Sequence, residues 1–220
     1  IKNILSGLRG GMYMVNAGMA KDKTTMLKES WDMVSRNVER VSDLVLSLLS
    51  YSKEREPERS ACSPNEIVFT AGGTEADNLA LRGIARARQS SGNHIVTSSI
   101  EHHAVLHTCK ALEEDGCRVT YLPVNENGQI DPYEAATSLT PKTILLSIML
   151  ANNETGAINP AEDIAEIAAE RSVLFHTDAV QALGKIPIQI KALGADLAAF
   201  AGHKIYGPKG SGFLYVKQGT

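Results

Sequence analysis

Several stretches of polar and small residues could carry chemistry, and each of them directly follows an apolar, β-prone run. Ligands of parallel α/β sheets bind outside the carboxyl ends of the strands, so residues in such positions can meet in one site. The stretches are residues 71–74, 101–103, 152–156, 176–181 and 202–204. Their residue types predict a single binding site at this edge of the sheet.

The first stretch, Ala-Gly-Gly-Thr at 71–74, opens a predicted helix and could cradle an anion. Small residues allow close approach to the backbone, the first N–H groups of a helix have no intrahelical partner, and Thr74 adds a hydroxyl. The same pattern also occurs in simple tight turns, and it fits neither the dinucleotide fingerprint nor the P-loop. Residues 202–212 are no nucleotide loop either, because Gly207 is followed by Pro208 where a P-loop needs lysine.

Three further residues complete a set that could hold a ring-bearing cofactor. His102 could stack on an aromatic ring or move a proton, although a histidine in this position can also belong to an ordinary surface loop. Asp178 ends an apolar run, where a carboxylate is costly to bury unless it is paired, and a pyridinium nitrogen would be such a partner. Lys204 follows another apolar run and is a candidate for a Schiff base with an aldehyde.

Residues 65–220 alternate strand-like and helix-like stretches, which predicts an α/β fold with a mostly parallel sheet and helices on both faces. The predicted strands cover residues 67–70, 94–99, 119–124, 143–149, 173–178, 197–201 and 212–216. The predicted helices cover residues 75–88, 104–114, 132–138 and 161–170.

Residues 1–57 are expected to form a separate two-helix hairpin that mediates dimerisation. The second helix has an apolar a/d pattern from Leu27 to Leu48 that is sustained over about three heptads, and the first carries one apolar stripe from Ile1 to Met19. Two such helices lack a third layer, so a second copy of the chain is the simplest partner. The charged, proline-containing run at 52–60 is the expected boundary.

Composition argues against some classes of function. The 220 residues carry a formal net charge of −3, which gives no electrostatic case for nucleic acid or an anionic membrane. The apolar runs are far shorter than the ~20 residues that cross a bilayer. Cys62, Cys109 and Cys117 show no metal-binding spacing and are expected to be reduced thiols of a cytoplasmic protein. The chain does not begin with Met, so its first residue is expected to be a cut end.

The chemical stretches together resemble the class V aminotransferase family, and the cysteine desulfurases most closely. The matching segments are residues 69–76, 101–105, 152–156, 176–181 and 202–210. The resemblance covers residues 63–220 and implies that they form the large domain of a transferase that uses pyridoxal 5'-phosphate (PLP). It implies removal of sulfur from L-cysteine, which gives alanine and an enzyme persulfide for iron–sulfur cluster or thiolation pathways through a sulfur-acceptor protein. A selenocysteine lyase or another class V aminotransferase is the alternative.

The resemblance also assigns roles at the ring end of the cofactor. It implies that Lys204 attaches the cofactor and that His102, the second catalytic residue, stacks on the ring. Asp178 would pair with the pyridine nitrogen, while Asn153 and Gln181 would lie near the phenolic oxygen.

At the phosphate end the resemblance implies that Gly73, Thr74 and His203 bind the cofactor. The family usually has Ser or Thr where this chain has Ala201, so one phosphate-binding hydroxyl is lost. No metal is implied.

The family's sulfur-accepting cysteine and its carboxylate-binding arginine lie well beyond the lysine. The sequence ends at Thr220, so this chain is expected to be an inactive fragment or a chimera. Cys109 falls on a predicted helix and Cys117 directly precedes a predicted strand, and both are interpreted as structural.

Residues 1–57 resemble a different family, the dimerisation and phosphoacceptor hairpin of sensor histidine kinases. This resemblance rests on residues 1–5 and 48–53, and the phosphorylated histidine would precede Ile1. It implies that the desulfurase family's own N-terminal segment is replaced. A natural fusion, an engineered chimera and a mis-assembled reading frame remain as explanations, and a histidine kinase dimerisation fragment is the alternative function of another class.

Overall fold

The chain forms two compact units, Ile1–Ser60 and Ala61–Thr220. The computed structural model describes residues 64–220 throughout, and in the first unit it describes residues 10, 12, 13, 15, 16, 19, 27, 28 and 30–38.

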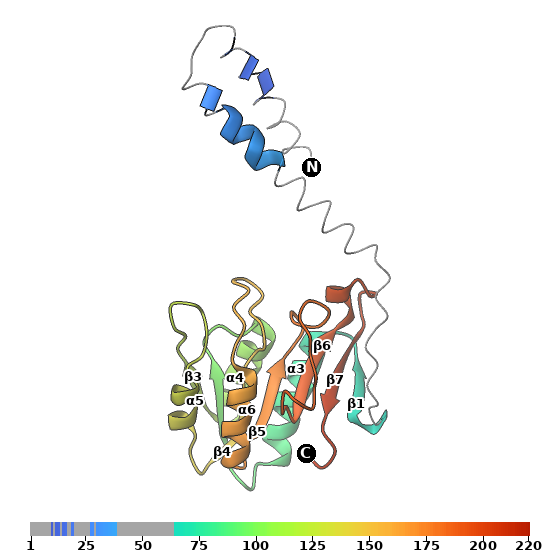
Figure 1. Cartoon of the computed structure of the whole chain (residues 1–220). Coiled ribbons are helices and arrows are strands. Elements are labelled where there is room, and N and C mark those ends of the chain that lie inside the picture. The colour runs from blue at the N-terminus through green and yellow to red at the C-terminus, as the bar shows by residue number, and fades with distance from the viewer. Residues whose placement is uncertain are drawn as a thin grey trace. The chain divides into compact units, whose positions relative to one another are not determined.

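The second unit is built on a seven-stranded sheet with the order β1-β7-β6-β5-β4-β2-β3 (Figure 1). Strand β7 is antiparallel to both β1 and β6, and the remaining pairs are parallel. The predicted mostly parallel sheet is therefore confirmed, and the antiparallel β7 adds to it. The strands are β1 (Ile67–Thr70), β2 (His94–Ser98), β3 (Arg118–Leu122), β4 (Thr143–Ser147), β5 (Leu174–Asp178), β6 (Leu197–Ala201) and β7 (Gly212–Val216).

Helices cover both faces of this sheet, as predicted (Figure 1). Successive strand residues point to opposite faces, so Leu145 of β4 packs with the core under α3 and α4, and Leu146 packs with the core under α5 and α6. The helices are α3 (Gly73–Ala87), α4 (His103–Glu114), α5 (Pro132–Ser138) and α6 (Ala161–Glu170), with short 3-10 turns η1 (Pro64–Glu66) and η2 (Gly202–Ile205).

Local sequence explains where these helices begin. The Asp131 carboxylate accepts a hydrogen bond of 2.9 Å from the Tyr133 N–H, and Pro132 occupies the first turn of α5. Helix α3 begins after Gly72, which offers no side chain to its first N–H groups. The start of α3 is therefore open to an external acceptor.

The described residues of the first unit are helical. Trp31 and Val38, which belong to the predicted a/d pattern, are 64% and 52% exposed. The remainder of the predicted hairpin lies outside the described residues, so the hairpin and its dimer stay predictions. Across the part of the chain that the structure describes, no helix combines the length and apolarity needed to cross a membrane.

Candidate functional site

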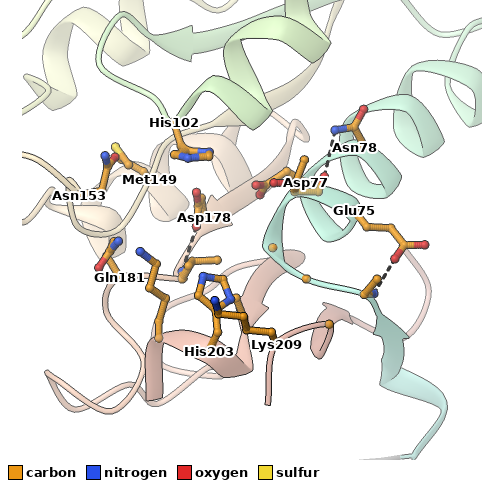
Figure 2. A pocket seen from close by; sticks show the side chains of 18 residues that line it. Glu75, Asp77, Asn78, His102, Met149, Asn153, Asp178, Gln181, His203 and Lys209 are labelled. Carbon is orange, nitrogen blue, oxygen red and sulfur yellow. Dashed lines mark hydrogen bonds between the residues drawn. The ribbon is translucent and has the colours of Figure 1, made fainter. Parts of the chain in front are cut away.

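A cavity of about 800 Å³ lies at the carboxyl edge of the sheet (Figure 2). Its volume is typical of a pocket for a small molecule or cofactor, about 300–1,000 Å³. Residues that follow β1, β2, β4, β5 and β6 line it, and so does the loop before β7, because an antiparallel strand begins at the edge where its neighbours end. The structure brings together all of the predicted site residues, while their roles stay predictions: Gly73, Thr74, His102, Asn153, Asp178, Gln181, His203 and Lys204.

The start of α3 forms one wall of the cavity. A Cβ atom at Gly73 would lie 2.6 Å from Val180 Cγ2, so the backbone approaches Val180 too closely for a side chain. With Gly72 offering no cap, the N–H groups of the first turn lie beside the Thr74 hydroxyl. This wall can bind an anion.

The segment after β6 forms the opposite wall and presents two predicted residues, His203 and Lys204. The Gly202 N–H donates to Ser211 O and the Gly207 N–H donates to Gly202 O, each over 2.9 Å. These bonds hold the segment in a tight loop. The loop also places Lys209 against the cavity, beside His203 (Figure 2).

His102 is held by its own helix. As the N-cap of α4, its Nδ1 atom accepts a hydrogen bond of 3.1 Å from the Ala104 N–H. This bond leaves Nε2 to carry the hydrogen of the neutral ring. The ring lies over Asp178 in the cavity (Figure 2).

Asn153 and Gln181 reach the cavity through fixed neighbours. Asn152 donates over 2.9 Å to the Ile100 carbonyl and so ties the loop after β4 to the loop after β2, which presents Asn153. Gln181 Oε1 accepts a hydrogen bond from Lys185 Nζ, which leaves its amide nitrogen to donate. The two amides therefore suit an acceptor oxygen.

Asp178 supplies a buried carboxylate to the site. It is 5% exposed, and its Oδ1 atom accepts a hydrogen bond of 2.9 Å from the Val180 N–H. Burial raises the pKa of Asp178 above its ordinary value, while the Val180 N–H, His102 and Lys204 oppose that rise. A carboxylate in these surroundings favours a cationic partner.

Sequence reasoning missed Asp77, which also lines the cavity and is 1% exposed. A polar residue inside a helix usually faces solvent, so its type gave no signal. The spacing of Asp77 did indicate burial. Ala80, Leu81 and Ile84 follow it at positions i+3, i+4 and i+7, so Asp77 belongs to the buried stripe of the helix. Lys209 was not predicted either, because it lies in the loop before β7 and does not directly follow a strand.

Comparison with known proteins finds relatives for most of the chain. The sequence profile described as Aminotransferase class-V matches residues 34–220. A cysteine desulfurase IscS of Clostridium botulinum is 43% identical over 215 residues, which are 95% of this chain and 54% of the relative. A cysteine desulfurase IscS of Methanosarcina thermophila is 51% identical over 172 residues, 78% of this chain and 43% of the relative. The chain spans about half the length of the curated relatives it matches.

Solved structures agree with these relatives. The structure titled "SspA in complex with cysteine" has a TM-score of 0.68 and 44% identity, covering 70% of this chain and 45% of its own. The crystal structure of DndA from Streptomyces lividans has a TM-score of 0.66 and 32% identity, covering 97% of this chain and 55% of its own.

The predicted histidine kinase resemblance of residues 1–57 finds no support in these comparisons. The class V profile begins at residue 34, inside that segment, and the Clostridium relative aligns over 95% of the chain. Coiled-coil-like spacing is shared by many dimerising hairpins, so the pattern alone was too general to assign a family.

Proposed function

This chain belongs to the class V aminotransferase family, and from that premise we propose that residues 64–220 form the PLP-binding part of a cysteine desulfurase. The observation that carries the proposal is the meeting of Lys204, Asp178 and His102 in one cavity. A primary amine, a buried carboxylate and an imidazole are the groups that a pyridine aldehyde needs around its ring.

The phosphate end of the cofactor fits the wall formed by α3. The uncapped first turn and the Thr74 hydroxyl supply hydrogen-bond donors, and Gly73 excludes a side chain that would fill the cradle. His203 and Lys209 would face these donors from the opposite wall. We assign Lys209 to the phosphate because it is a cation of the cavity that the ring does not require.

The ring end fits the strand-end residues. Lys204 Nζ would hold the aldehyde carbon, the Asp178 carboxylate would keep the ring nitrogen protonated, and the His102 imidazole would stack on the ring. Asn153 and Gln181 would donate to the phenolic oxygen through their amide nitrogens.

When bound, PLP supplies an electron sink for bond breaking at the substrate α-carbon. The residues of the chain would bind and orient it, and Lys204 Nζ would move a proton at the substrate α-carbon. In the overall reaction the bond between the β-carbon and the sulfur of L-cysteine breaks, and the β-carbon takes a proton. The sulfur forms an S–S bond with an enzyme thiolate. The products are L-alanine and a persulfide.

Neither described cysteine fits the role of that thiolate. Cys109 is fully buried, and burial raises its pKa to about 12. Burial also raises the pKa of Cys117, and neither residue lines the cavity. We therefore assign the sulfur-accepting thiolate to another cysteine of the enzyme.

The partners belong to the same proposal. The substrate is L-cysteine, supported by the names of the relatives and by the neighbour solved with cysteine, which favour it over selenocysteine. We propose a homodimer and a separate sulfur-acceptor protein, in a reducing cytoplasm that suits the free thiols of Cys109 and Cys117.

Covalent capture tests the proposal. The chain is incubated with PLP, reduced with borohydride, digested and mapped by mass spectrometry. We expect the pyridoxyl group on Lys204, and Lys204→Ala removes it while Lys217→Ala, a change outside the cavity, does not. A folded chain labelled at another lysine, or at none, contradicts the assignment. L-Cysteine but not L-serine should then alter the visible absorbance of the unreduced complex.

A further inference from the structure

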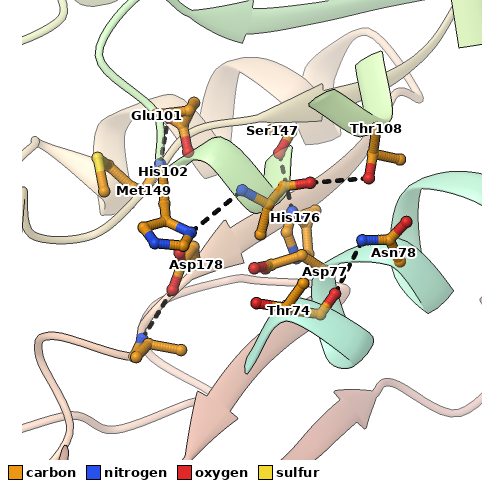
Figure 3. Close-up of polar contacts among 12 residues, drawn as sticks. Thr74, Asp77, Asn78, Glu101, His102, Thr108, Ser147, Met149, His176 and Asp178 are labelled. Atoms are coloured by element: carbon orange, nitrogen blue, oxygen red, sulfur yellow. Dashed lines mark hydrogen bonds and ion pairs between the residues drawn. The ribbon is translucent and has the colours of Figure 1, made fainter. Parts of the chain in front are cut away.

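Some buried polar atoms in and near the cavity wall lack hydrogen-bond partners, and Figure 3 shows Asp77, Glu101 and His176, which carry three of them. Within the described part of the chain these atoms are Asp77 Oδ1, Glu101 Oε2, His176 Nε2 and Thr177 Oγ1. Unpaired buried polar atoms are rare in folded proteins and call for a physical explanation. Two of these residues are carboxyls near Asp178, so the question is how many of the three carboxyls carry a charge.

Asp77 and His176 face each other. His176 Nε2 lies 3.6 Å from Asp77 Oδ1, and the two side chains are 0% and 1% exposed. On the other side of the ring, His176 Nδ1 lies 2.8 Å from Ser147 Oγ. A line of side chains thus runs from β4 through β5 to α3 and ends at the carboxyl of Asp77, on the cavity wall.

Glu101 is held differently. Its Oε1 atom accepts hydrogen bonds from Ser98 Oγ over 2.6 Å and from the Met149 N–H over 2.8 Å, while Oε2 has no partner. Burial raises the pKa of Glu101 to about 8. This carboxyl therefore carries a proton at neutral pH.

The surroundings of Asp77 contain more acid than base. The titratable groups that face it are His176 and Asp178 from β5 and Glu101 from the loop after β2. Burial raises the pKa of Asp178, and His102 and Lys204 oppose that rise. Burial, then Asp178, then Glu101 raise the pKa of Asp77. Burial lowers the pKa of His176 to about 3, so its ring stays neutral. Neighbouring buried carboxyls repel one another when ionised, so not all of them carry a negative charge at the same time.

We propose that Asp77 is a positioning residue that holds its proton against the neutral ring of His176, so that Asp178 alone of the three carboxyls carries the negative charge. In this arrangement His176 Nδ1–H donates to Ser147 Oγ, and the bare Nε2 faces the carboxyl proton of Asp77. The proton distribution is a property of the chain by itself. Its consequence, a single anionic partner for one ring nitrogen, rests on the proposed function.

Infrared spectroscopy of the apo chain tests the proton distribution directly. A protonated carboxyl has a carbonyl stretching band that a carboxylate lacks. At neutral pH Asp77→Asn and Glu101→Gln should each remove one such band. The matched change Asp178→Asn should remove carboxylate absorption and leave the Glu101 band in place. An Asp77→Asn difference spectrum that shows loss of carboxylate absorption instead would overturn the proposal.

A pH titration separates charge coupling from a structural role. If Asp178 is the charge that keeps the proton on Asp77, Asp178→Asn should let the Asp77 band disappear at a lower pH than in the parent chain. A band that titrates at the same pH in both proteins shows that Asp178 does not set the proton on Asp77. That result would also overturn the proposal.

The positions of the protons on Asp77 and His176 can also be tested without a variant that must fold. Nitrogen NMR of the ¹⁵N-histidine-labelled chain should show His176 neutral at pH 7, with its hydrogen on Nδ1. A doubly protonated ring, or a hydrogen on Nε2, places the proton away from Asp77 and overturns the proposal. Both measurements use the apo chain, so they can succeed while the borohydride test fails, and the two ideas are judged separately.

Discussion

His94 and His176 are both buried side chains of the sheet, but they lie at opposite ends of its parallel strands. At the amino end of β2, His94 Nδ1 lies 2.7 Å from Thr143 Oγ1 and Nε2 lies 2.9 Å from Thr120 Oγ1. Near the carboxyl end of β5, His176 has one partner, Ser147, and its Nε2 atom has none. Both rings are almost inaccessible, at 3% and 0% exposed.

The difference separates structural burial from burial that serves a site. At the amino end the polar groups satisfy one another, as expected where folding alone is at stake. At the carboxyl end Asp77 and Glu101 stay partly unsatisfied beside a cavity. Unpaired buried polar atoms reduce stability, and proteins retain them where a ligand or a bound proton supplies the missing interaction.

The largest expected effect is on the pH dependence of stability through Glu101. Its folded pKa is raised from 4.5 to about 8, so between these values the folded state keeps a proton that the unfolded state releases. The stability that this proton supports is present below pH 4.5 and is lost as the pH rises toward 8. Glu101→Gln should remove a pH dependence on the order of 4 kcal/mol between pH 5 and pH 8. Urea unfolding at pH 5 and pH 8 measures it.

The amino end should titrate in the opposite direction. Burial, then Arg118, lower the pKa of His94, so the stability it provides is present above pH 6.5 and is lost as the pH falls. His94→Gln should flatten the acid side of the curve and leave the window of Glu101 unchanged. Parallel curves for the parent chain and both variants would remove the distinction between the two ends.

The affinity for PLP should depend on residues at the carboxyl end of the strands and not on residues at the amino end. Asp178→Asn removes a charged partner of the ring nitrogen and should weaken PLP binding by about tenfold to a hundredfold, the loss of one charge-assisted hydrogen bond. His94→Gln, at the amino end, should leave the affinity within about twofold, because it touches no part of the cavity. Titration of the apo chain with PLP, followed by absorbance, measures both. Equal losses of PLP affinity in the two variants would mean that Asp178→Asn weakens binding by disturbing the fold.

Most of the second unit could be predicted from sequence because its signals are local. Residues 67–70, 197–201 and 212–216 were predicted as strands with the bounds that they have, and so were the helices at 132–138 and 161–170. Apolar runs, proline and an N-cap aspartate fix these elements within a few residues of the chain. The antiparallel direction of β7 depends on pairing with β1 and β6, which no local pattern encodes.

The site divides in the same way. Asp178 ends β5 and Lys204 follows β6, and position at the end of a strand is a local signal. Asp77 meets His176 across 99 positions of the chain, and only the packing of α3 on β5 brings them together. The a/d pattern of the first unit is also a strong local signal, but it predicts helices only and did not identify the family.

Two glycines of α3 allow a matched test of the cavity wall. Gly73→Ala places a Cβ atom 2.6 Å from Val180 Cγ2 and should cost about 1–3 kcal/mol of stability as well as PLP affinity. Gly83 has no atom within 4 Å of the same added carbon, so Gly83→Ala should stabilise the helix by about 0.5–1 kcal/mol. Denaturant midpoints compare the two. Equal stabilisation by both changes would show that the close approach at Gly73 is not needed.

The smallest expected effect is a gain, at the residue where the chain departs from the family pattern. Ala201 ends β6 and is 1% exposed, and its Cβ would lie 3.6 Å from a Cβ added at Gly73, so it points toward the start of α3. Ala201→Ser would place a hydroxyl beside the predicted phosphate site and should tighten PLP binding by about threefold to tenfold, the worth of one hydrogen bond. Pyridoxal, which lacks the phosphate, should bind unchanged, and Lys209→Met should weaken PLP alone. If Ala201→Ser changes both ligands alike, residue 201 acts on the ring or on the fold, and the phosphate must lie elsewhere in the cavity.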